Sequence, residues 1–135
     1  MPFRRIAIAL SMALFAAATP ALAQRGAVEQ QADPAASGEQ WYQQQLVDLA
    51  EVLGGSHYLR VLCHGRDDQR WRNAMRGVIQ REPEYNNLLV DAFNRGYRQE
   101  EARYSDCDAT AAQSEAELRA RGLRISQALS ARHAE

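Results

Sequence analysis

The sequence predicts an all-α protein, a compact bundle of about four helices closed by one disulfide bond. Apolar residues recur every three or four positions in four stretches of the chain, as on the buried face of a helix. No stretch shows the two-residue alternation of a half-buried β-strand. Two cysteines, Cys63 and Cys107, stand at the end of the first stretch and the start of the last.

The first 23 residues have the three parts of a secretory signal peptide. Arg4 and Arg5 precede an almost wholly apolar run over residues 6–18, and Ala-Leu-Ala at 21–23 suits a signal peptidase. The apolar run is shorter than the roughly 20 residues that a membrane-spanning helix needs. We therefore expect export, cleavage after Ala23, a periplasmic location and no transmembrane anchor in the mature chain.

The overall charge narrows the classes of partner. The whole chain has a formal charge of −1, and removal of Arg4 and Arg5 makes it −3. A mildly acidic domain lacks the basic character typical of nucleic-acid-binding proteins, so we expect no nucleic-acid partner. Every basic side chain is arginine, a bias that genome composition explains as well as anion recognition does.

The mature chain divides into a tether and a helical domain. Residues 24–38 are rich in Gln, Ala, Gly and Pro without apolar periodicity, which predicts a flexible tether. Residues 39–135 form the predicted helical domain, whose first helix covers 39–63. Gly54-Gly55 in the middle of this stretch is unfavourable for a helix, because glycine is a poor helix former. Either the helix breaks there or another helix approaches closely, and we favour the close approach.

Capping residues predict the second helix. Gly65 suits the end of the first helix, and Asp67 or Asp68 suits the start of the second. Pro83 ends this helix at Glu82, because the residue before proline avoids the helical region. Its predicted buried stripe comprises Trp71, Met75, Val78 and Ile79.

The third helix is predicted from about Glu84 to Tyr104. Ser105 or Asp106 is expected to cap a fourth helix that begins near Cys107. The predicted buried positions are Leu88, Leu89, Ala92, Phe93, Gly96 and Tyr97 in the third helix, and Leu118, Gly122, Ile125 and Leu129 in the fourth.

The two cysteines predict a structural disulfide. An even number of cysteines in an exported chain is typical of disulfide pairing. A Cys63–Cys107 bond would fasten the first helix to the fourth and stabilise the fold by roughly 4 kcal/mol, less any strain. A metal or redox pair would need cysteines close in sequence, and these are far apart.

The sequence offers little support for catalysis. His57, His64 and His133 lack the His-Glu-x-x-His spacing of a zinc site, and we interpret His57 as a structural histidine. Gly-x-Ser-x-Gly and glycine-rich phosphate loops are also missing. The adjacent carboxylates Glu100-Glu101 are expected to cap helices or face solvent. We predict no catalytic residue, no metal and no cofactor.

Clustered arginines are the best candidate for a binding surface. Six arginines lie between residues 60 and 82, against three acidic side chains, and such a cluster can bind phosphate or carboxylate groups. The alternative is that these arginines form ion pairs across the bundle with Asp91, Glu100, Glu101 and Glu117. Asparagine is a weak helix former, so either packing or ligand binding would explain the presence of Asn94 within the third helix. The candidate surface comprises Arg60, Arg72, Arg76, Asn94 and Arg98.

Several motifs resemble a family of small uncharacterised alphaproteobacterial exported proteins. The matching segments are His57-Tyr58-Leu59-Arg60-x-Leu62-Cys63, Phe93-Asn94-x-Gly96-Tyr97-Arg98 and Tyr104-x-x-Cys107, together with Trp71 and Met75. The resemblance covers roughly residues 46–132. It implies an exported helical domain with paired cysteines, and it implies no activity, cofactor or substrate.

These observations predict a non-catalytic envelope interaction or accessory protein. Its expected partner is an envelope protein or an anionic envelope component. The alternative is a small envelope enzyme acting on peptidoglycan or lipid, which would need His57 or a carboxylate in an open cleft with a shifted pKa.

Overall fold

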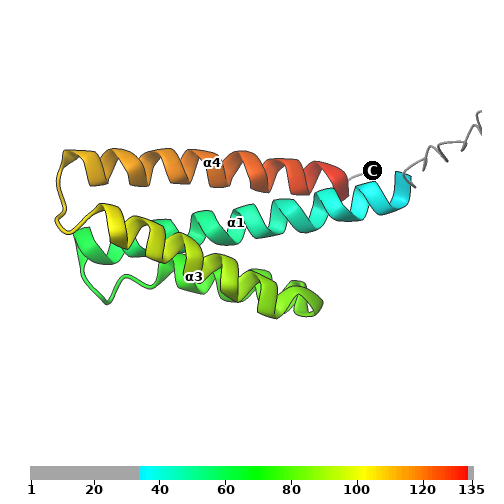
Figure 1. Cartoon of the computed structure of the whole chain (residues 1–135), viewed down its shortest axis with the longest axis horizontal. Helices are drawn as coiled ribbons and strands as arrows, with labels where there is room; N and C mark the ends of the chain where they lie inside the picture. The colour runs from blue at the N-terminus through cyan, green and yellow to red at the C-terminus, as the bar shows by residue number, and fades with distance from the viewer. Residues whose placement is uncertain (1–33, 134–135) are drawn as a thin grey trace, which may run out of the picture. The chain divides into compact units, whose positions relative to one another are not determined.

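Four α-helices make up the fold in a computed structural model that describes residues 34–133 (Figure 1). They are α1 (Pro34–His64), α2 (Arg70–Arg81), α3 (Asn86–Arg103) and α4 (Ala109–His133), and a 3-10 turn, η1 (Pro83–Tyr85), joins α2 to α3. The described residues contain no strand, so the all-α prediction is confirmed. The expected signal peptide and residues 24–33 of the expected tether lie outside the described residues. Within the described part, no helix is long and apolar enough to cross a bilayer.

The first helix begins earlier than the sequence suggested. α1 starts at Pro34 rather than near Glu39, so the assignment of residues 34–38 to a flexible tether was wrong. Proline fits the first helical position because its φ is already helical and its missing N–H is not needed there. The carbonyl of Gly38 also accepts a hydrogen bond from Arg132 Nη1 of α4 at 2.5 Å. This tertiary contact secures a segment whose composition alone predicts disorder.

Gly54-Gly55 does not break α1, and the predicted close approach is confirmed. A Cβ atom at Gly54 would lie 1.9 Å from the carbonyl oxygen of Phe93 in α3. A Cβ atom at Gly96 of α3 would lie 1.9 Å from the carbonyl oxygen of Glu51 in α1. The two glycines therefore let α1 and α3 cross with their backbones in contact.

The predicted end of α1 is correct, but the predicted start of α2 is not. Gly65 has a positive φ of 93° and donates its N–H to the carbonyl of Val61 at 2.9 Å. Gln69 occupies the N-cap position of α2, rather than Asp67 or Asp68. The Asp68 carboxylate instead pairs with two side chains, Arg60 Nε at 2.8 Å and Arg70 Nε at 3.0 Å. The backbone N–H of Arg70 donates to it only over a long 3.4 Å.

The starts of α3 and α4 also differ from the prediction. Pro83 first forms the 3-10 turn η1, and α3 begins at Asn86 rather than Glu84. Asp108, not Ser105 or Asp106, caps α4, because its carboxylate accepts the N–H of Ala111 at 2.9 Å. Ser105 instead donates to the Asp106 side chain at 2.8 Å.

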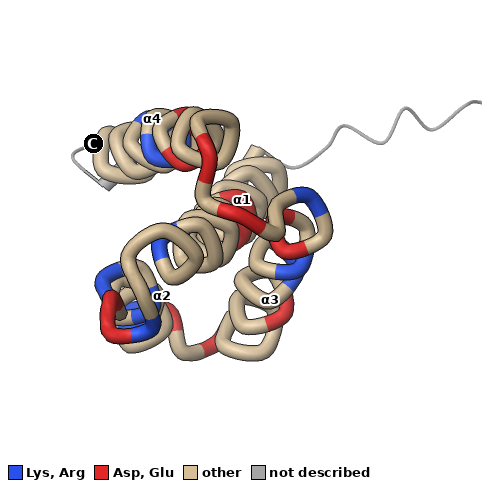
Figure 2. The backbone as a smooth tube through the Cα atoms, turned by 90° about the vertical axis from the view of Figure 1, so that its left-hand side faces the viewer, with Lys and Arg blue, Asp and Glu red and all other residues tan. Residues whose placement is uncertain are grey.

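α1 is the central helix of the bundle. In Figure 2, α1 lies between α4 on one side and α2 and α3 on the other, and each of these helices packs against it. Leu88 was expected in the core but is exposed, since the next residue, Leu89, faces α1. The buried apolar core contains Leu46, Leu49, Ala50, Val52, Leu53, Met75, Val78, Leu89, Ala92, Ile125 and Leu129.

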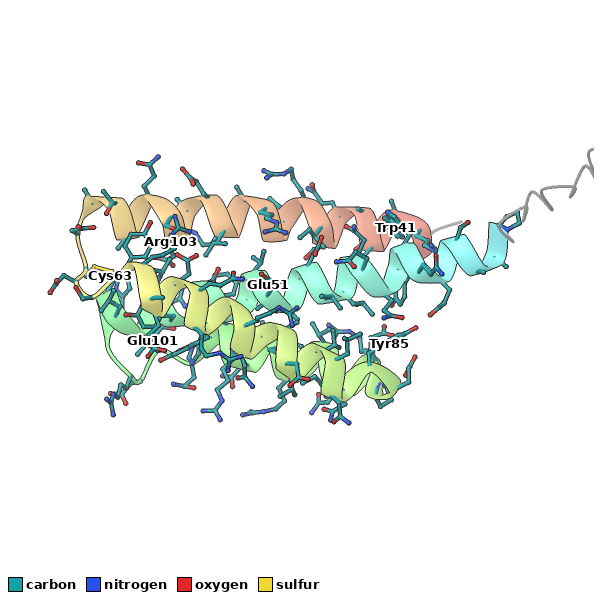
Figure 3. The ribbon with its side chains drawn as sticks, in the orientation of Figure 1. Trp41, Glu51, Cys63, Tyr85, Glu101 and Arg103 are labelled. Atoms are coloured by element: carbon teal, nitrogen blue, oxygen red, sulfur yellow. A yellow bond between two sulfur atoms is a disulfide. The ribbon has the colours of Figure 1, made fainter. Side chains whose placement is uncertain are left out.

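The predicted disulfide is present. Cys63 at the end of α1 is bonded to Cys107 before α4, with 5.0 Å between the Cα atoms. Figure 3 shows Cys63 at one end of the bundle and Trp41 and Tyr85 at the other. The bond therefore clamps only one end, and α2 and α3 lie in the loop that it closes.

Candidate functional site

Arg60 is separated from the rest of the expected binding surface. Its Nε lies 2.8 Å from Asp68 and its Nη1 lies 3.4 Å from Glu115 of α4, and its side chain is 17% exposed. The hydrogen bond from Arg60 is the main reason why the pKa of the Asp68 carboxyl falls to about 2. Arg60 thus joins the α1–α2 loop to α4, as the ion-pair alternative expected of these arginines, although with other carboxylates than the four considered.

Arg72, Arg76 and Asn94 share a groove between α2 and α3, which we call the α2–α3 groove. It is a cavity of about 290 Å³. Arg72 and Arg76 are one turn apart on α2, and Asn94 faces them from α3. The remaining lining is apolar and consists of Met75, Ile79, Val90 and Phe93.

The α2–α3 groove combines positive charge with an apolar floor. Arg72 and Arg76 are exposed and form no ion pair with any residue that the structure describes. Val90 at its edge is 39% exposed. Two guanidinium groups beside exposed apolar surface can bind a carboxylate or phosphate that carries an apolar neighbour.

Arg98 does not line this groove. It is exposed on α3, one helical turn beyond Asn94. The structure therefore brings together three of the five residues of the expected surface and leaves Arg60 and Arg98 apart.

His57 lies in the protein interior beside Phe93, a residue of the groove. It is 7% exposed, and its ring centroid lies 5.8 Å from that of Phe93 and 6.0 Å from that of Tyr97. Burial lowers the pKa of His57, and the positive charge of Arg72 lowers it further. Its Nδ1 has no hydrogen-bond partner among the described residues. This setting favours a neutral, packed imidazole over a catalytic base in an open cleft.

Glu100 is a carboxylate whose burial the sequence did not predict. It is 5% exposed, accepts a hydrogen bond from Ser114 of α4 at 3.2 Å and pairs with Arg103 at 3.2 Å. A signal was present in the sequence, since Ala92, Gly96 and Glu100 are spaced by four residues on one helical face. The expectation that Glu100 caps a helix or faces solvent was therefore wrong, whereas Glu101 is exposed.

A polar cleft of about 530 Å³ lies between the end of α3 and α4, with Glu100 and Glu117 in its lining. Each carboxylate is already bound: Glu100 to Ser114 and Arg103, and Glu117 to Gln113 at 2.9 Å. No histidine lines this cleft. The described residues also contain no group of three or more His, Cys, Asp or Glu side chains placed to hold a metal ion.

A central helix, one disulfide and open amphipathic grooves define a small all-α, disulfide-bonded protein. Within this class, residues 41–133 match a family described as "Protein of unknown function (DUF2385)", and the chain belongs to that family. The expected membership of an uncharacterised family is thus confirmed. Neither a curated protein nor a solved structure matches the chain.

Proposed function

We propose that this chain is an exported, periplasmic and non-catalytic accessory protein of the cell envelope, which binds an acidic segment of an envelope protein in the α2–α3 groove. The observation that carries the proposal is the pair Arg72 and Arg76, unpaired among the described residues and set over an apolar floor. The signal-peptide pattern of residues 1–23 supports the location.

The lining of the groove defines the chemistry of the partner. The two arginines offer paired N–H donors to carboxylates, and Asn94 offers an amide to a backbone group. The floor, which includes Met75 and Phe93, accepts an apolar side chain. The partner segment therefore carries acidic residues beside a large apolar residue.

Site-specific cross-linking in living cells tests this proposal. A photo-reactive amino acid at position 94 should cross-link one envelope protein, which mass spectrometry identifies. Arg72→Glu with Arg76→Glu should abolish the cross-link, because reversed charges repel an acidic segment and weaken binding by about 100-fold or more.

A matched variant controls for net charge. Arg66→Glu with Arg124→Glu makes the same change in charge at two exposed arginines outside the groove, and it should leave the cross-link intact. Equal loss in both double variants would show a general charge effect, and an undiminished cross-link in Arg72→Glu with Arg76→Glu would refute the proposed site.

A further inference from the structure

A second groove runs along the opposite side of α2, between α2 and α4, with α1 as its floor. Three adjoining cavities of about 240, 380 and 230 Å³ form this α2–α4 groove. All three are lined by Leu49 of α1 and Ser126 of α4. In Figure 2, α4 lies on one side of α1 and α2 on the other, and the lining of each cavity includes residues of both α2 and α4.

The lining of the α2–α4 groove extends along α1. Its first cavity is lined by Tyr42 of α1 and its last by Ser56. At a rise of about 1.5 Å per residue, these positions are about 21 Å apart along α1. A fully extended 16-carbon chain spans roughly 20 Å, given C–C bonds of about 1.5 Å. The length of the groove therefore matches one long acyl chain.

The floor of the α2–α4 groove is little exposed. Its floor residues are at most 9% exposed, although they line the cavities; they are Leu49, Leu53, Val78 and Leu129. A surface that binds an amphipathic helix presents a wide row of apolar contacts for anchors at i, i+3, i+4 and i+7. Among the described lining residues, Leu123 is the only large apolar side chain that is exposed, at 60%. The low exposure of this floor favours a single flexible chain over a helix.

Charge distinguishes the two ends of the groove. The cavity near Ser56 contains Arg119 and no acidic residue in its lining, and Arg119 forms no ion pair with a described residue. The cavity near Tyr42 contains Arg81 but also Glu82. An anionic head group is therefore favoured at the Arg119 end.

We propose that the α2–α4 groove binds one long-chain fatty acid, with its carboxylate at Arg119 and its acyl chain directed along α1 toward Tyr42. This site lies on the other side of α2 from the α2–α3 groove and does not depend on the function proposed above. It assigns a lipid ligand to a family for which no ligand follows from the family description.

Trp71 provides a reporter inside the groove. Trp71 lines two of the three cavities, and the chain has two tryptophans. In the exported protein carrying Trp41→Phe, Trp71 is therefore the sole tryptophan. Hexadecanoate brominated near mid-chain, added below its micellar concentration, should quench Trp71 emission saturably with one ligand per protein. The matching brominated hexadecyltrimethylammonium should bind at least tenfold more weakly.

Gly77→Leu tests the location without threatening the fold. Gly77 lines the central cavity, and a Cβ atom there would meet only the Arg81 guanidinium, at 3.8 Å. Leucine also favours a helix more than glycine does. We expect the added side chain to occupy the groove and weaken hexadecanoate binding at least tenfold. Gln80→Leu, an exposed position of α2 outside the lining, should leave binding unchanged.

Paired arginine variants test the orientation. Arg119→Gln should weaken hexadecanoate binding about tenfold, and Arg81→Gln, with the same loss of charge, should have less than a twofold effect. Arg72→Glu with Arg76→Glu should leave hexadecanoate binding intact, which separates this site from the α2–α3 groove.

Four results would overturn the proposal. The first is that brominated hexadecanoate does not quench Trp71 saturably although circular dichroism shows a helical protein, and the second is that only vesicles of anionic brominated phospholipid quench Trp71. The third is that Gly77→Leu binds hexadecanoate with unchanged affinity. The fourth is that the protein sediments as a dimer and that Gly77→Leu dissociates this dimer. The last result would assign the groove to a second copy of the chain.

Discussion

At the scale of single residues, Gly54 and Gly96 control how closely the two most tightly packed helices approach. Each glycine faces the backbone of the other helix, and a Cβ atom at either would lie 1.9 Å from a carbonyl oxygen. A carbonyl oxygen of a helix cannot move aside as a flexible side chain can, so the helices themselves would have to separate.

We predict that Gly54→Ala destabilises the protein by about 3 kcal/mol or more, because separation of α1 and α3 disturbs the packing along their whole contact. Chemical denaturation followed by circular dichroism measures this change. Gly77→Ala is the control, since its Cβ atom would make only an ordinary contact with the Arg81 guanidinium, and it should be neutral or stabilising by up to about 1 kcal/mol. Equal stability of Gly54→Ala and the wild type would contradict the observed crossing.

His57 should make stability depend on pH. Its folded-state pKa lies below the ordinary value of 6.5, chiefly through burial and then through Arg72, with Asp68 opposing. The unfolded chain therefore binds this proton more readily than the folded protein does. The free energy of unfolding should be highest above the ordinary pKa and fall as the pH decreases through 6.5 toward the folded-state pKa.

Urea unfolding at several pH values between 5 and 8 measures this dependence. His57→Asn should reduce the slope of the free energy of unfolding against pH, whatever the variant's stability at any single pH. If the variant kept the slope of the wild type, another group would be responsible.

At the scale of elements, α1 organises the bundle, and each of the other helices packs mainly on it. α2 is the shortest of the four α-helices at 12 residues, and it contributes Met75 and Val78 to the core. Because α2 packs mainly on α1 and only lightly on α3 and α4, a groove remains on either side of α2. The disulfide compensates at one end by holding the start of α4 against the end of α1.

Loss of the Cys63–Cys107 bond should lower the melting temperature by on the order of 10 °C, because the bond closes a 44-residue separation and thereby restricts the unfolded chain. Thermal melts with and without a reductant measure the effect. Cys63→Ser with Cys107→Ser should melt at the reduced temperature and show no further response to the reductant. An unchanged melt of the reduced wild type would remove the stabilising role of the bond.

At the scale of the whole molecule, the proposed role depends on export as much as on the grooves. A disulfide persists in an oxidising compartment, so the observed Cys63–Cys107 pair agrees with the signal-peptide pattern of residues 1–23. The described helical part begins at Pro34, beyond the expected cleavage site.

We predict that the protein recovered from a periplasmic fraction begins at Gln24. Intact-mass measurement and N-terminal peptide mapping check this expectation. Ala23→Arg should block cleavage, because the peptidase requires a small residue before the cleaved bond. A periplasmic protein that retained residues 1–23, or a protein found only in the cytoplasm, would contradict the proposed location.

Much of the fold can be predicted from local sequence signals. The spacing of Leu46, Leu49 and Leu53 predicts α1, Gly65 predicts its end, and Pro83 predicts the end of α2. These predictions succeed because apolar periodicity and the conformational limits of glycine and proline act within a few residues. The cysteine pairing also follows from the chain, since two cysteines allow only one intramolecular bond.

Other features depend on contacts between distant segments. Arg132 secures the residues around Gly38, Arg60 draws Asp68 away from its expected cap, and Ser114 binds the buried Glu100. The same applies to the grooves, because a groove belongs to the space between helices and no single helix encodes it. The chain alone thus predicts which helices form and that Cys63 bonds to Cys107. The folded arrangement determines which arginines remain unpaired and where open apolar surface lies, because both depend on how closely the helices pack around α1.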